Sequence, residues 1–206
     1  MKIAVLLSGS GTTLENIFEH VERGELPVEV AVVVSSRADA FGIERAKKRG
    51  VPTHVVARRA FATLEEYTEA VFAPIKESGA ELVVFAGFMV QLGVPEDYRD
   101  RILNVHPALL PSFGGKGMYG HFVHEAVLAH GCKVSGCTVH IVNSEYDRGP
   151  IVMQKSVPVL EDDTPDTLAG RVQAAEREVY PLAIRAFAEG RVVVEGGRAT
   201  VRTDQA

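Results

Sequence analysis

Short, continuously apolar runs alternate with stretches of helical spacing along the first half of this chain. The strand-like runs lie at residues 2–7, 28–34, 53–56 and 82–86, and the helical stretches at 14–18, 41–49 and 63–78. Continuous apolar runs are typical of strands that are buried on both faces, and such strands pair in parallel beneath covering helices. The sequence therefore predicts an α/β fold with a mostly parallel, doubly wound, Rossmann-like sheet.

The second half of the chain carries longer elements and more turn residues. We expect a helix at 121–130, strands at 138–142 and 151–159, a long helix capped at Thr164, and a hairpin at 192–201. The proline within 151–159 places that strand at a sheet edge, where a missing backbone N–H is tolerated. These elements predict an antiparallel C-terminal part.

The composition excludes several classes of protein. The 206 residues are 46% hydrophobic, which suits one substantial core, so we expect a single domain over residues 1–206. The net charge of −5 is dispersed, which argues against a nucleic-acid surface, and no apolar run approaches a membrane span. Cys132 and Cys137 are expected to be reduced thiols. We predict a cytoplasmic protein that binds small molecules, as a monomer or homodimer.

Two polar residues, Asn104 and His106, end an apolar run just before Pro107. Ligands of open α/β sheets bind outside the carboxyl ends of strands, so this stretch is expected to be a strand that opens into an active-site loop. Alternation along the strand places both side chains on one face. An Asn amide can donate to a developing oxyanion, and a His can donate a proton or carry a charge beside it. We therefore predict catalytic roles for both residues.

A carboxylate to orient the imidazole is expected from Asp147, which follows the strand-like run at 138–142. Asn, His and Asp side chains that converge from two loops would form a site for acyl transfer. A simpler interpretation exists for each residue, because a His before Pro and an Asp before x-Gly-Pro are both common in turns.

The segment Ser-Gly-Ser-Gly-Thr-Thr at 8–13 joins the first strand to the first helix. Free backbone N–H groups at a helix N-terminus favour an anion, so Gly11, Thr12 and Thr13 are candidates to bind a phosphate. The segment matches neither a Walker A loop nor the dinucleotide fingerprint, which favours a mononucleotide or sugar phosphate. In the alternative interpretation, Thr12 or Thr13 simply caps the helix.

The motifs Asn-Val-His-Pro-Ala-Leu-Leu-Pro at 104–111 and Asp-Arg-Gly-Pro at 147–150 together resemble the folate-dependent formyltransferases. The resemblance covers nearly the whole chain and is strongest to members that act in purine synthesis. It implies transfer of the formyl group of 10-formyltetrahydrofolate to the amine of phosphoribosylglycinamide. Asn104 and protonated His106 would stabilise the oxyanion, Asp147 would favour the charged imidazole, and no metal is expected.

The resemblance also implies ligand-binding segments elsewhere in the chain. Folate would be bound by Met89, Val90, Gln91, Leu92 and Asn104, and the glycinamide and ribose by Gln173 and Glu176. Val90 and Leu64 stand where the family often has Arg, and Thr13 stands where it often has Asn. The glycine-rich segment 114–120 is longer than in the best-known members and is expected to act as a lid.

Three alternative functions are open. A formyltetrahydrofolate hydrolase would use the same three residues on water, but such enzymes usually carry an extra N-terminal regulatory domain. Methionyl-tRNA formyltransferases usually carry a C-terminal RNA-binding domain. A non-catalytic or NADP-binding module could use Arg37 after the second strand, but it leaves Asn104, His106 and Asp147 without a role.

Overall fold

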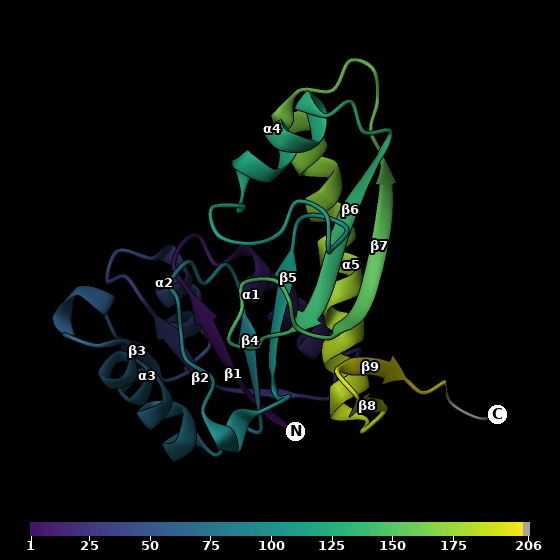
Figure 1. Ribbon diagram of the computed structural model, residues 1–206. Coiled ribbons are helices and arrows are strands. Elements are labelled where there is room, and N and C mark those ends of the chain that lie inside the picture. The colour runs from purple at the N-terminus through teal and green to yellow at the C-terminus, as the bar shows by residue number, and fades with distance from the viewer. Residues whose placement is uncertain (204–206) are drawn as a thin grey trace. The chain divides into compact units, whose positions relative to one another are not determined.

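The computed structural model describes residues 1–203, and the chain forms two compact units that meet between Leu103 and Asn104 in the sequence. The first unit contains four parallel strands in the order β3-β2-β1-β4 (Figure 1). These strands are β1 (Lys2–Leu7), β2 (Glu29–Ser35), β3 (Thr53–Val55) and β4 (Leu82–Phe85). Nearly every residue of β1, β2 and β4 is buried, which is the burial expected of strands covered on both faces.

The helices of the first unit follow its strands in strict alternation. They are α1 (Thr12–Glu22), α2 (Phe41–Lys48) and α3 (Leu64–Ser78), with short 3-10 turns η1 (Arg58–Ala60) and η2 (Glu96–Tyr98). α3 begins at a capping box in which the Thr63 hydroxyl and the Glu66 carboxylate satisfy each other's backbone N–H groups. α1 begins two residues earlier than predicted, so Thr12 and Thr13 lie in its first turn.

The carboxyl ends of β1, β2 and β4 lie side by side. Leu7 pairs with Ser35 across β1 and β2, and Leu6 pairs with Phe85 across β1 and β4. The segments that leave these strands therefore start from one edge of the parallel sheet, where ligands of such folds bind.

The second unit contains the strands in the order β5-β6-β7, of which β6 and β7 are antiparallel. Its elements are β5 (Ile102–His106), α4 (His121–Ala129), β6 (Val134–Ile141), β7 (Ile151–Pro158), α5 (Pro165–Ala188), β8 (Val192–Glu195) and β9 (Arg198–Val201), with β5 starting before the boundary between the units. The predicted mostly parallel α/β fold with an antiparallel C-terminal part and a terminal hairpin is confirmed. Within residues 1–203, no helix has the length and apolar character needed to cross a membrane.

Two boundaries differ from the prediction for a physical reason. β6 begins at Val134 because Gly136, with a backbone that approaches Lys155 closely, continues the ladder instead of ending it. β7 ends at Pro158, one residue before the predicted end, because this proline pairs with Val134 at the end of the edge strand and has no N–H to continue the ladder.

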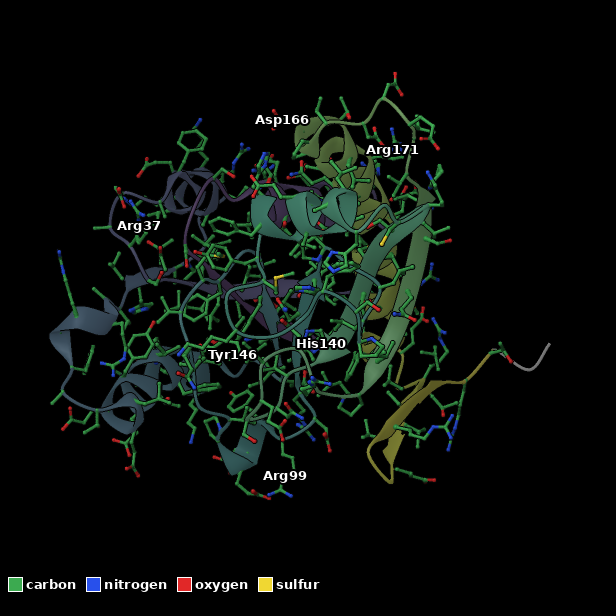
Figure 2. The ribbon with its side chains drawn as sticks, turned by 45° about the horizontal axis from the view of Figure 1, so that its top comes forward. Arg37, Arg99, His140, Tyr146, Asp166 and Arg171 are labelled. Carbon is green, nitrogen blue, oxygen red and sulfur yellow. The ribbon has the colours of Figure 1, made fainter. Side chains whose placement is uncertain are left out.

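The N-terminus of α5 is fixed by Asp163, whose side chain is only 2% exposed. Its carboxylate accepts hydrogen bonds from the Arg171 guanidinium at 2.6 and 2.9 Å and from the Leu160 N–H at 2.8 Å. The Arg171 guanidinium, together with the Leu160 N–H and the Thr167 hydroxyl, holds the pKa of Asp163 far below its ordinary value. Arg171 lies in the N-terminal part of α5 (Figure 2).

We expect Asp163→Asn to lower the midpoint of thermal unfolding at pH 7 by about 2 to 4 °C. Because the pKa of Asp163 is depressed on folding, its contribution is complete above the pKa of the unfolded carboxyl and is lost as the pH falls through the folded value. The variant should therefore lose less stability than the wild type between pH 5 and about pH 2. Melting curves across this range test both points, with the neighbouring exposed Asp162→Asn as a control that should match the wild type.

Candidate functional site

The loop after β5 is held by hydroxyl and amide groups of β6 and β7. The Thr138 hydroxyl accepts a hydrogen bond from the Leu110 N–H (3.0 Å) and donates one to the Ala108 carbonyl oxygen (2.7 Å). Gln154, which pairs with Thr138 across the strands, donates to the Leu110 carbonyl oxygen (3.0 Å) and to the Thr138 hydroxyl (2.9 Å). Because buried backbone groups need such partners, these contacts fix the loop that leaves His106.

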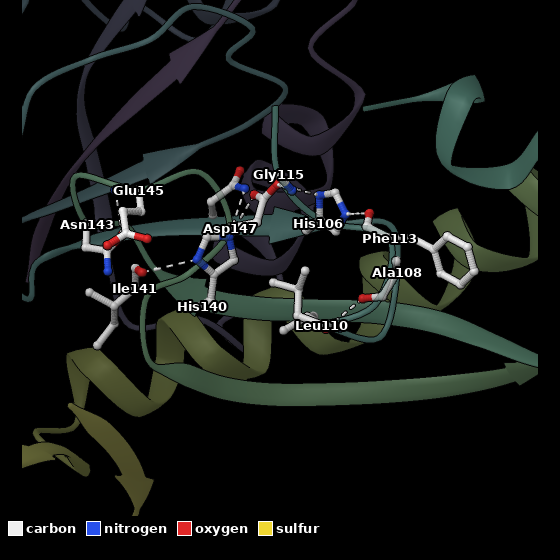
Figure 3. Close-up of polar contacts among 12 residues, drawn as sticks. His106, Ala108, Leu110, Phe113, Gly115, His140, Ile141, Asn143, Glu145 and Asp147 are labelled. Carbon is white, nitrogen blue, oxygen red and sulfur yellow. Dashed lines mark hydrogen bonds and ion pairs between the residues drawn. The ribbon is translucent and has the colours of Figure 1, made fainter. Parts of the chain in front are cut away.

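His106 is almost completely buried, at 4% exposure, and both of its ring nitrogens face polar atoms. Nε2 lies 2.8 Å from the carbonyl oxygen of Phe113, which can only accept, so Nε2 carries the hydrogen. Nδ1 lies 3.6 Å from Oδ2 of Asp147 (Figure 3). In the neutral ring, Nδ1 is therefore the atom that can take up a proton, and this proton would lie beside a carboxylate.

A second imidazole, that of His140 on β6, lies at the other oxygen of Asp147. Its Nε2 is 3.5 Å from Oδ1 of Asp147 and 3.2 Å from Nδ2 of Asn104 (Figure 3). Its Nδ1 is 3.1 Å from the Ile141 carbonyl oxygen and donates to it, so Nε2 of the neutral ring accepts a hydrogen bond from the Asn104 amide. The His140 imidazole thus lies between the side chains of Asn104 and Asp147.

The structure therefore brings together the three predicted catalytic residues through a fourth that the sequence analysis missed. We refer to Asn104, His106, His140 and Asp147 as the polar cluster. A signal for His140 existed: it is two residues from Thr138, so both polar side chains share one face of a mostly apolar strand.

Asp147 has a left-handed backbone conformation (φ 55°), and a glycine makes this turn possible. A Cβ on Gly149 would lie 1.7 Å from the Ile141 carbonyl oxygen, so only glycine fits there. The Gly115 N–H donates a hydrogen bond to Oδ2 of Asp147 (2.9 Å), which anchors the start of the segment 114–120 to the polar cluster.

Burial and charge act in opposite directions on the pKa values of this cluster. Burial lowers the pKa of His106, and the attraction of Asp147 offsets only part of the effect. Burial alone would raise the pKa of Asp147, but the contacts with His140, His106 and the Gly115 N–H hold it below its ordinary value. Burial therefore works against the charged imidazole at His106, and Asp147 works in its favour.

The phosphate-binding candidates lie in the first unit, at the start of α1. Gly11 is the N-cap residue, with a left-handed backbone (φ 71°) and no side-chain hydrogen bond to the helix. The interpretation of Thr12 or Thr13 as the cap is therefore wrong, and the first N–H groups of the helix receive no side-chain cap. A Cβ on Gly11 would lie 2.5 Å from Cα of Gly42, which explains why the position takes glycine.

Comparison with known proteins decides the family. A family profile described as formyl transferase matches residues 1–184. The chain belongs to the formyl transferase family. The resemblance seen in the sequence motifs is thereby confirmed.

Two curated relatives and one solved structure illustrate how this formyl transferase compares with others. It is 38% identical to phosphoribosylglycinamide formyltransferase of Escherichia coli, over 93% of this chain and 89% of that protein. It is 39% identical to the trifunctional purine biosynthetic protein adenosine-3 of Gallus gallus, over 96% of this chain but only 20% of that protein. The structure of glycinamide ribonucleotide transformylase 1 from Symbiobacterium toebii matches it with a TM-score of 0.92 and 43% identity, over 98% of this chain and 94% of that one. The formyltransferase fold is therefore confirmed.

The remaining predicted site residues of this formyl transferase lie outside the polar cluster. Met89 is 55% exposed and Gln91 is exposed, whereas Val90 is half-buried and Leu92 is buried, all in an irregular segment after β4 of the first unit. On α5 of the second unit, Gln173 is exposed and Glu176 is half-buried. Burial raises the pKa of Glu176 to about 7. Within residues 1–203, no group of three or more His, Cys, Asp or Glu side chains is placed to hold a metal ion.

We expect Asp147→Asn to lower the pKa of His106 further, because the carboxylate is the main group that favours the charged imidazole against burial. An NMR titration of the imidazole C–H resonances measures this shift. Glu145→Gln is the matched control, since Glu145 is an exposed carboxylate of the same loop. A His106 pKa that is the same in all three proteins would show that Asp147 does not act on the imidazole.

Proposed function

We propose that this protein transfers the formyl group of 10-formyltetrahydrofolate to the amine of phosphoribosylglycinamide, giving the formylated product and tetrahydrofolate in purine biosynthesis. The observation that carries the proposal is the polar cluster, in which an amide and a carboxylate are joined through imidazoles in a formyl transferase. The names and extensive coverage of the Escherichia coli and Symbiobacterium relatives support the choice of substrates.

The proposed reaction is direct attack of the substrate amine on the formyl carbon. A carbon–nitrogen bond forms to the amine, the bond to N10 of the folate breaks, and one proton moves from the attacking nitrogen to the leaving nitrogen. Asn104 has a second amide N–H besides the one that His140 accepts, and this N–H can donate to the oxyanion of the tetrahedral intermediate. His106 Nδ1 can hold the proton in transit, because the resulting charge is stabilised by Asp147.

Both units contain residues for which we propose roles in ligand binding. The free N–H groups and hydroxyls of Gly11, Thr12 and Thr13 are proposed to bind the substrate phosphate. Gln173 and Glu176 are proposed to contact the glycinamide and ribose; Met89, Val90, Gln91, Leu92 and Asn104 are proposed to contact the folate. A single functional domain over 1–206, a cytoplasmic location and a monomeric or homodimeric state are proposed along with this function.

The rival functions differ in what they release. Incubation with 10-formyltetrahydrofolate, with and without phosphoribosylglycinamide, should release tetrahydrofolate only when the amine is present. Release without the amine would instead support a formyltetrahydrofolate hydrolase. Failure to release any tetrahydrofolate, combined with tight NADPH binding, would support a non-catalytic nucleotide-binding module.

We expect Asn104→Ala to lower kcat by about 10² to 10³ while leaving the affinity for a folate analogue largely intact, because an oxyanion donor acts where charge develops. Steady-state kinetics and analogue titration measure the two quantities. Asn143→Ala is the matched control, because Asn143 is an exposed amide of the loop that carries Asp147, and its side-chain oxygen accepts a hydrogen bond from the Glu145 N–H. An Asn104→Ala enzyme as fast as Asn143→Ala would contradict the oxyanion role.

The phosphate role predicts a substrate-dependent loss. Thr12→Val and Thr13→Val should each lower kcat/KM for phosphoribosylglycinamide by about 10-fold or more, the effect of removing a hydrogen bond to a charged group. The same variants should leave the much slower reaction of glycinamide, which has no phosphate, unchanged. Equal losses on both substrates would show that the threonines act only on folding. Gly11 is unsuitable for this test, because any side chain there would strike Gly42.

A further inference from the structure

Ser8 lies directly between the two ligand-binding segments proposed for the first unit. It is the residue before the phosphate loop, which we define as residues 9–13, and its side chain reaches the folate segment, which we define as residues 89–92. The Met89 N–H donates to the Ser8 hydroxyl oxygen at 2.9 Å, and the Ser8 N–H donates to the Gly87 carbonyl oxygen at 3.1 Å. Ser8 therefore fixes the start of the folate segment through both its backbone and its side chain.

The Ser8 hydroxyl is engaged by the protein itself and is not available to a ligand. Ser8 is 8% exposed, and its oxygen lies 2.7 Å from the hydroxyl oxygen of Ser36, which is 6% exposed. Ser36 in turn donates its N–H to the Leu7 carbonyl oxygen at 3.1 Å. The hydroxyl pair thus ties together the chain as it leaves β1, β2 and β4, and any effect of Ser8 on binding has to pass through the segments it holds.

The other end of the folate segment has a separate anchor. The Gly93 N–H donates to the Thr68 hydroxyl oxygen at 2.9 Å, and the Thr68 hydroxyl donates to the Leu64 carbonyl oxygen at 2.7 Å on α3. A Cβ on Gly93 would lie 3.0 Å from the Thr68 oxygen, so the two chains approach closely. Within residues 1–203, the hydrogen bonds of the Thr68 hydroxyl reach Gly93 and Leu64 and not the phosphate loop.

The phosphate loop also has an anchor of its own. Nε of Arg45 on α2 donates to the Ser10 carbonyl oxygen at 3.0 Å, and the same guanidinium pairs with Glu15 at 2.8 Å. Arg49, the C-cap residue of α2, pairs with Glu15 at 2.6 Å and with Glu22 at 2.8 Å, and within residues 1–203 its hydrogen bonds do not reach the loop. Arg45 and Arg49 are therefore a matched pair that differ in their contact with Ser10.

We infer that Ser8 is a positioning residue shared by the phosphate loop and the folate segment, so that one hydroxyl sets the geometry of both substrate sites. This inference rests on the proposed function. Removal of the hydroxyl leaves the part-buried Met89 N–H without its acceptor, and the loss of this hydrogen bond frees the backbone that carries it to shift. Because Ser8 is also continuous with the phosphate loop, the relaxation reaches both segments.

The test compares the two Michaelis constants of four variants. Ser8→Ala should raise KM for both phosphoribosylglycinamide and 10-formyltetrahydrofolate by about 5-fold or more, the effect of one lost hydrogen bond at each segment. Thr68→Val should raise only the folate KM, and Arg45→Met only the phosphoribosylglycinamide KM. Arg49→Met should leave both constants within about 2-fold of the wild type, since it keeps the Ser10 contact.

A Ser8→Ala enzyme that changes only one KM, or neither, overturns the inference while leaving the proposed function intact. A wild-type protein that does not transfer the formyl group overturns the proposed function, and with it the inference about Ser8 that rests on this function. Thermal unfolding of each variant shows whether it is folded. If Ser8→Ala fails to fold, Ser8→Cys gives the same comparison, because a thiol accepts hydrogen bonds only weakly.

Discussion

A carboxylate held between two imidazoles is the interaction on which the second unit is organised. Asp147 is mostly buried, and a buried charge is stable only where opposite charge or hydrogen-bond donors compensate for the lost water. The Gly115 N–H donates a hydrogen bond to Asp147, and the imidazoles of His106 and His140, which lie 3.6 and 3.5 Å from its two oxygens, stabilise the charge whenever either ring takes up a proton. The position of one carboxylate therefore constrains the end of β5, the end of β6 and the start of the glycine-rich segment together.

The types of the elements and the mostly parallel pairing followed from the sequence because the signals were strong and local. Continuous apolar runs predicted β1, β2 and β4, helical spacing predicted α3, and the capping residue Thr164 predicted the start of α5. The start of α1 was misplaced because Thr12 and Thr13 are common caps, whereas here a left-handed Gly11 takes the N-cap position and is packed against Gly42. That packing between α1 and α2 leaves no local trace in the sequence.

Local sequence signals also pointed to part of the candidate site, and the rest depends on how distant segments pack. Asn104, His106 and Asp147 stand at strand ends beside prolines and glycine, where polar residues indicate function. His140 lies within a buried strand, where polar side chains on one face indicate a buried polar contact but not its partner, and its role appears only when β6 is placed beside Asn104 and Asp147. The sequence could not predict the direction in which the pKa of His106 is shifted, because burial lowers this pKa while the nearby Asp147 carboxylate raises it.

Thr138 uses the whole bonding capacity of its hydroxyl, with one hydrogen donated to Ala108 and two lone pairs given to Leu110 and Gln154. Such a saturated group defines a single geometry, because any shift that favours one partner weakens the other two. Serine could supply the same bonds with a freer rotamer, whereas valine, which is close to threonine in shape, would leave the Leu110 N–H and the Ala108 carbonyl oxygen without this partner and the Gln154 amide with Leu110 alone. The conformation of the loop after His106 is thus set by a residue that need not contact the substrate. Substitutions at this strand position in other formyl transferases would change how accurately the catalytic side chains are placed, without changing which side chains they are.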